Sequence, residues 1–169
     1  MRIIFVITIL CVATACRTKS SYFNIQGQKF DNKVIEQLPI YDSLSHLLIE
    51  NYSAIRPHFQ EGNSFEYIWY RHGNELYKIL PQEPGTKVKQ WFKQLGDSLI
   101  FGFTLYKDSS VKIFVRDTYL DAYKLNVRER LSFNPKGATI KKREFKTRDT
   151  LLNKNWEYWI WFDDQVDIF

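Results

Sequence analysis

The stretch YKLNVRERLSF at residues 123–133 is the clearest indication of the fold. Apolar residues from Tyr123 to Phe133 occupy most of the alternate positions, with polar or basic residues between them. Successive side chains of a strand point to opposite faces of a sheet. The alternation therefore predicts a strand with one buried face and one basic face.

The stretch WEYWIWF at residues 156–162 has the same period of two. Alternation sends Trp159 and Trp161 to the face opposite to that of Trp156. One of these faces belongs to the core. The other is either covered by a helix or forms an aromatic patch open to a ligand, and the rarity of large exposed apolar patches favours core on both faces.

Shorter stretches also predict strands joined by tight turns. They lie at residues 65–70, 76–80, 99–106, 111–116 and 139–148. The turn sequence NPKG at residues 134–137 predicts that residues 123–133 and 139–148 pair as a hairpin, with the second strand at an edge. Sequential strands on short turns favour an antiparallel meander of about six to seven strands, either flat or curled.

Two segments have the helical spacing of apolar residues instead. The first covers about residues 41–55, after Pro39, and the second covers residues 88–95, before Gly96. Helices that cover one face of an antiparallel sheet give an α+β fold.

The composition agrees with one globular domain. Of 169 residues, 44% are hydrophobic, 17% aromatic and 25% charged, which is sufficient for a substantial core. The net charge of +5 is too small an excess to indicate a nucleic-acid partner. Both cysteines, Cys11 and Cys16, lie in the first 16 residues, so we expect a domain without disulfide bonds.

The first 16 residues have the order of an export signal. Arg2 precedes an uncharged stretch, residues 3–15, which is shorter than the ~20 residues of a membrane-spanning helix. The stretch VATAC at residues 12–16 resembles the lipobox of bacterial lipoproteins. This resemblance implies transfer of diacylglycerol to the Cys16 sulfur, cleavage between Ala15 and Cys16, and acylation of the new amine.

Two alternatives for this segment remain. It could be a buried N-terminal helix or strand, or an ordinary signal peptide cut after Ala15, which would leave Cys16 as a thiol. The lipoprotein interpretation predicts a signal peptide at residues 1–15, a lipidated N-terminus and tether at residues 16–32, and a single α+β domain at residues 33–169.

The resemblance to a lipobox also implies a place in the cell envelope, where the N-terminal lipid would hold the protein to a membrane. The chain is similar to small lipoproteins of the Bacteroidota type, whose surface-exposed members carry an acidic stretch after the cysteine. Residues 17–21, RTKSS, contain no acidic residue. We therefore expect a periplasm-facing position, and the sequence leaves open whether the membrane is the inner or the outer one.

No catalytic, cofactor or metal motif is present in the sequence. It contains no HExxH pair, no G-x-S-x-G elbow and no glycine-rich phosphate loop. The three histidines, His46, His58 and His72, are too scattered to predict a metal site. Dispersed carboxyl groups leave a periplasmic hydrolase as the alternative function. They are those of Glu61, Glu66, Asp163 and Asp164.

The candidate interaction surface is the basic face of the predicted hairpin. Its residues are Lys124, Arg128, Arg130, Lys141, Arg143 and Lys146. An acidic protein or an anionic glycolipid would fit it, and a solvated sheet face is the alternative. The aromatic patch of Trp159 and Trp161 is the second candidate. Together these features favour a non-enzymatic binding module, such as an immunity-type lipoprotein or an accessory subunit of an envelope complex.

The anchor is tested by intact-mass analysis of protein extracted from membranes. We expect a chain that begins at Cys16 and carries acyl chains, because two or more chains hold a protein stably in a bilayer where one does not. Cys16→Ala should prevent lipidation and leave the chain unprocessed or soluble. An unmodified Cys16 in the wild-type extract would contradict the prediction.

Overall fold

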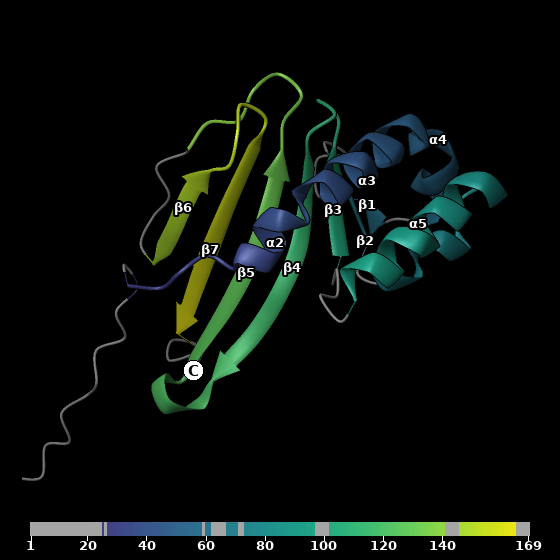
Figure 1. Ribbon diagram of the computed structural model, residues 1–169. Coiled ribbons are helices and arrows are strands. Elements are labelled where there is room, and N and C mark those ends of the chain that lie inside the picture. Colours follow the sequence, from purple (N-terminus) through teal and green to yellow (C-terminus); the bar gives the residue numbers. More distant parts are fainter. Residues whose placement is uncertain are drawn as a thin grey trace, which may run out of the picture.

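The computed structural model describes residues 25, 27–58, 60–61, 67–70, 73–96, 102–140 and 146–164 (Figure 1). The helices are α2 (Asn32–Glu36), α3 (Leu38–Glu50), α4 (Tyr52–Ile55) and α5 (Gln82–Leu95). Three short 3-10 turns are η1 (Arg56–His58), η2 (Gly73–Lys78) and η3 (Asp121–Tyr123).

The strands form one antiparallel sheet in the order β1-β2-β3-β4-β5-β7-β6. The body of the sheet consists of β3 (Gly102–Tyr106), β4 (Val111–Leu120), β5 (Leu125–Phe133), β6 (Thr147–Leu151) and β7 (Trp156–Asp164). The short strands β1 (Gln60–Glu61) and β2 (Tyr67–Tyr70) extend one edge. The predicted α+β class with an antiparallel sheet is thus confirmed, although the body has five strands rather than six to seven.

The predicted hairpin between residues 123–133 and 139–148 is wrong. Strand β7 lies between β5 and β6, and it pairs with β5 from Leu125↔Asp164 to Phe133↔Trp156. The turn at residues 134–137 does form, with Gly137 at φ +113°, but it leads to the far edge of the sheet. Strand β7 has a continuous apolar face that packs beside the apolar face of β5. Residues 139–148 have too few apolar side chains to form such a face.

The helix boundaries differ from the predicted ones because prolines lie in the first turns of two helices. Pro39 lies in the first turn of α3, where a missing N–H costs no hydrogen bond, so the helix begins earlier than Tyr41. Pro84 lies in the first turn of α5 in the same way. The strand expected at residues 76–80 is instead η2 and the turn after it. Residues 65–66, 99–101 and 141–145, parts of three predicted strands, lie outside the described residues.

The helices cover one face of the sheet. Figure 1 shows α2 over the central strands and α3, α4 and α5 gathered towards β1, β2 and β3. Leu44, Leu48 and Ile55 from the helices are fully buried in the same core cluster as Phe103 of β3 and Phe162 of β7. Burial of such side chains is worth about 1.5–3 kcal/mol each, and it holds the helices to this face.

The segment before α2, inside the predicted tether, also packs on this face. Ile25 and Phe30 lie against the core, and the ring centre of Phe30 is 4.9 Å from that of Tyr158 on β7. The Asp31 side chain accepts a hydrogen bond from the Lys33 N–H at 2.9 Å and so caps α2. The chain therefore joins the domain at its helix-covered face.

Candidate functional site

The second face of the sheet carries the candidate functional site. Side chains that alternate with the core residues of β3, β4, β5 and β7 lie there, and we call this surface the open face. It comprises Tyr106, Lys112, Phe114, Arg128, Arg130, Ser132, Glu157, Trp159 and Trp161. The structure thus brings two of the predicted basic residues together with both tryptophans of the predicted aromatic patch.

Cations and aromatic rings stack alternately on the open face. The Arg130 guanidinium carbon lies 4.4 Å from the ring centre of Phe114, 4.9 Å from that of Trp159 and 5.4 Å from that of Trp161. The Lys112 ammonium lies 5.6 Å from the Trp159 ring centre. Each such contact is worth about 0.5–2 kcal/mol, and the long side chains cover apolar surface while their charges stay near water.

The ring of Trp159 is almost completely covered by the neighbouring side chains of this stack. It is 6% exposed, yet among the described residues it is the one buried hydrophobic side chain outside the main core cluster. Its indole N–H donates to the Ser132 hydroxyl at 3.0 Å. Trp159 is therefore no exposed patch, and the surface presented to a partner consists largely of the half-buried groups above it.

Carboxylates offset part of the predicted positive charge. Arg128 lies 3.4 Å from Asp117 and 3.4 Å from Asp163, and its guanidinium carbon is 5.1 Å from the Trp161 ring centre. Exposed pairs of this kind contribute about 0–1 kcal/mol, so they orient Arg128 more than they stabilise the fold.

The other predicted basic residues do not join the open face. Lys124 occupies a left-handed turn before β5, 3.9 Å from Asp121. Lys146 precedes β6, two strands away from β5. Lys141 and Arg143 lie outside the described residues. The six-residue basic surface is therefore reduced, in the described structure, to Arg128 and Arg130, with Lys112 as a neighbour that the sequence did not single out.

A pocket of about 320 Å³ opens at one end of the open face, and we call it the open-face pocket. Lys112, Glu157 and Trp159 line it from the sheet, and Asp108 and Asn134 line it from the adjoining turns. Glu157 is only 4% exposed, so an acidic side chain is buried in the wall of this pocket.

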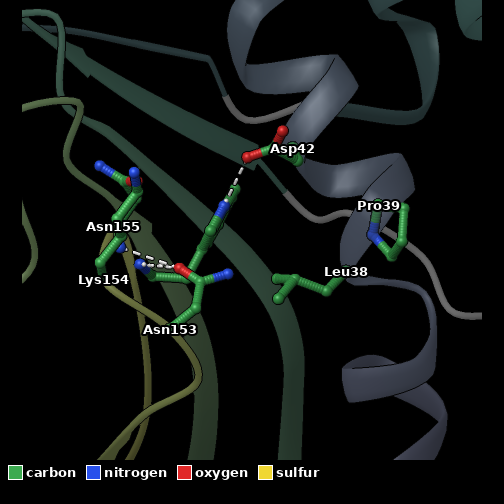
Figure 2. A pocket seen from close by; sticks show the side chains of 7 residues that line it. Leu38, Pro39, Asp42, Asn153, Lys154 and Asn155 are labelled. Atoms are coloured by element: carbon green, nitrogen blue, oxygen red, sulfur yellow. Dashed lines mark hydrogen bonds between the residues drawn. The ribbon is translucent and has the colours of Figure 1, made fainter.

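A second, larger pocket of about 490 Å³ lies between α3 and the β6–β7 turn. Figure 2 shows Leu38, Pro39 and Asp42 on one side and the turn at residues 153–155 on the other. Asp42 Oδ1 accepts the indole N–H of Trp156 at 2.7 Å, and Asn153 Oδ1 accepts the N–H groups of Asn155 and Trp156. Because these groups bond to one another, this pocket is a junction that holds α3 to the sheet.

A polar network centred on the buried Glu129 and Tyr158 occupies the helix-covered face. Arg116 of β4 donates to Glu129 Oε1 at 3.0 Å and to Asp31. The Tyr158 hydroxyl donates to the other oxygen of Glu129, and the Asp31 N–H donates to the Tyr158 oxygen at 3.4 Å. A β-bulge between Phe114 and Arg116 turns the arginine to this face.

The pKa values reflect this environment. Burial and the Glu129 carboxylate raise the pKa of Tyr158 far above its usual value, so the phenol stays protonated and donates. Burial and the Asp31 charge raise the pKa of Tyr41 to about 12. The pKa of Asp31 is lowered overall. Burial is the largest single effect and raises this pKa. The hydrogen bond and the charge of Arg116, together with backbone N–H groups at the start of α2, lower it by more.

The sequence contains one signal for this network. Glu129 interrupts the apolar alternation of β5, because it occupies a core-facing position between Val127 and Leu131. Its partners Arg116 and Tyr158 lie 13 and 29 residues from it along the chain, on other strands, and no spacing rule connects them.

No group of histidine, cysteine, aspartate or glutamate in the described part of the chain is arranged to hold a metal ion. His46 is exposed on α3, His58 lies in η1, and His72 is outside the described residues. Likewise, no described helix is long and apolar enough to cross a membrane.

Comparison with known proteins finds no matching family model, no similar curated protein and no similar solved structure.

The Asp31 contact predicts a specific pH dependence of stability. A lowered folded-state pKa stabilises the fold above the unfolded-state pKa, near 3.8, and this contribution is lost as the pH falls through the folded-state value. Asp31→Asn keeps a capping side chain but removes the charge. Its free energy of unfolding, measured with urea, should fall below that of wild type at neutral pH, and the difference should shrink below about pH 4.

Asp121→Asn is the matched control, because the Asp121 side chain is 88% exposed and 3.9 Å from Lys124. It should change stability little at any pH. A difference between wild type and Asp31→Asn that is the same at every pH would contradict the assigned role of Arg116.

Proposed function

We propose that this chain is a lipid-anchored protein of the cell envelope that acts as a non-enzymatic binding module through its open face. The observation that carries the proposal is the composition of that face. It has no described helix over it, and it presents Arg128 and Arg130 on a support of stacked aromatic rings.

The stacking supports binding because it fixes the positions of two long side chains before a partner arrives. An arginine immobilised against aromatic rings loses less conformational entropy on binding, and its planar N–H groups suit carboxylate or phosphate oxygens. Arginine, tryptophan and tyrosine are also enriched among the residues that dominate binding energies in interfaces. An acidic protein or an anionic glycolipid of the envelope is the partner class that fits.

The anchor and the open face are compatible. The chain enters the domain at the helix-covered face, through Phe30 and Asp31, and the stretch from Cys16 to Ile25 reaches at most about 30 Å when fully extended. A lipid on Cys16 would therefore hold the domain close to the membrane and leave the opposite face free to meet a partner.

Hydrolysis is the second candidate, since Asp108 and Glu157 line the same pocket. A glycosidase of this type needs one protonated carboxyl group as the general acid. Hydrogen bonds from the Ser110 hydroxyl and N–H hold the pKa of Asp108 below its usual value, which keeps this group ionised. Asp108 is thus unsuited to the acid role, so hydrolysis at this pocket would require Glu157 as the acid.

Affinity capture from detergent-solubilised envelopes tests the binding module. The variant Arg128→Gln with Arg130→Gln removes both guanidinium groups and should lose partners that the wild-type protein retains at low salt. The dependence of retention on salt should also become weaker. Circular dichroism verifies that the variant is folded.

The matched control replaces two exposed lysines on helices, Lys33→Gln and Lys93→Gln, which removes the same charge from the other face. This control should retain the wild-type partners. Equal loss in both variants would mean attraction to net charge alone, and no loss in the arginine variant would remove the open face as the binding surface.

A further inference from the structure

The open-face pocket has the chemistry of a ligand site. Its volume of about 320 Å³ lies at the lower end of the range of ~300–1,000 Å³ for small-molecule sites. One wall consists of the aromatic side chains of Tyr106 and Trp159, and the buried Glu157 carboxylate lies in the same lining. An apolar wall with a few fixed polar groups is the usual construction of such sites.

The lining carries groups of both charges, which favours a ligand without net charge. The Lys112 ammonium lies 5.4 Å and 5.6 Å from the ring centres of Tyr106 and Trp159, where it would repel a cation. Asp108 and Glu157 in the same lining would repel a phosphate or another anion. A neutral ligand that can both donate to a carboxylate and accept from an ammonium can bind to the groups of both charges.

Hydroxyl groups complete the lining and favour a polyhydroxylated ligand. The Ser132 oxygen accepts the Trp159 N–H, so its own O–H is oriented as a donor. The Ser110 hydroxyl donates to Asp108 at 2.6 Å, so its oxygen is left as an acceptor. Thr139 lines the exposed rim of the pocket. Alternating donors and acceptors beside aromatic rings match a sugar ring, which has hydroxyls at its edge and C–H groups on its faces.

We propose that the open-face pocket binds a neutral saccharide, as a monosaccharide or disaccharide unit of a glycan. This inference rests on the proposed function of the open face and names the ligand chemistry at one end of it. Tyr106 contacts the C–H groups of the sugar above the largely covered Trp159, while Glu157, Lys112 and Ser132 bind its hydroxyls.

The test uses the full-length protein in a detergent without a sugar head group. Saturation-transfer NMR and calorimetry are carried out with glucose, galactose, N-acetylglucosamine and their β-linked disaccharides, and in parallel with inorganic phosphate and glycine. Glycine has no net charge but lacks the hydroxyls and the C–H face of a sugar. We therefore expect binding of at least one saccharide and none of phosphate or of glycine. Ala138→Leu fills the pocket without removing a side-chain hydrogen bond and should weaken saccharide binding by about tenfold or more.

Ala54→Leu is the control, because it adds the same volume at an exposed position of α4 and should leave the affinity unchanged. Glu157→Gln tests the buried carboxylate, and if that variant fails to fold, Ala138→Leu still decides. The inference is overturned if no saccharide binds, if phosphate or glycine binds instead, or if Ala138→Leu binds as wild type does. In those cases, loss of partners in the Arg128 and Arg130 variant would still support the binding module.

Discussion

The pairing of β7 with β5 is the constraint on which the rest of the structure depends. The two strands are matched over nine residue pairs, from Leu125↔Asp164 to Phe133↔Trp156. Side chains directly opposite one another in an antiparallel pair share a face. This register sets Arg130 beside Trp159 on the open face, and a slip of one residue would send each β7 side chain to the wrong side.

The same register gives the two faces different side-chain arrangements. On the helix-covered face it places Tyr158 within reach of Glu129, and through Arg116 that pair holds Asp31 at the start of the domain. A buried charge left without partners costs several kcal/mol, so the network fixes where the N-terminal segment meets the sheet. On the open face the register builds the stack of cations and rings. The segment that leads to the proposed anchor and the proposed binding surface therefore lie on opposite sides of one sheet.

The sequence predicted those features that depend on neighbouring residues. Alternation placed Trp159 and Trp161 opposite to the core, and apolar spacing predicted both main helices. It did not predict that β7 would separate β5 from β6, because a turn at residues 134–137 is compatible with either pairing. Nor did it predict the open-face pocket, since residues distant along the chain meet there only after the sheet has formed.

Measurement of the β5–β7 register by NMR tests the central claim most directly. Nuclear Overhauser effects between backbone protons across the sheet report which residues are paired. The account predicts cross-strand contacts between Arg130 and Trp159 and between Arg128 and Trp161. Two results would contradict this pairing: contacts from β5 to residues 139–148, or a β7 register shifted by one residue. Either is incompatible with the stack on the open face and with the network around Glu129.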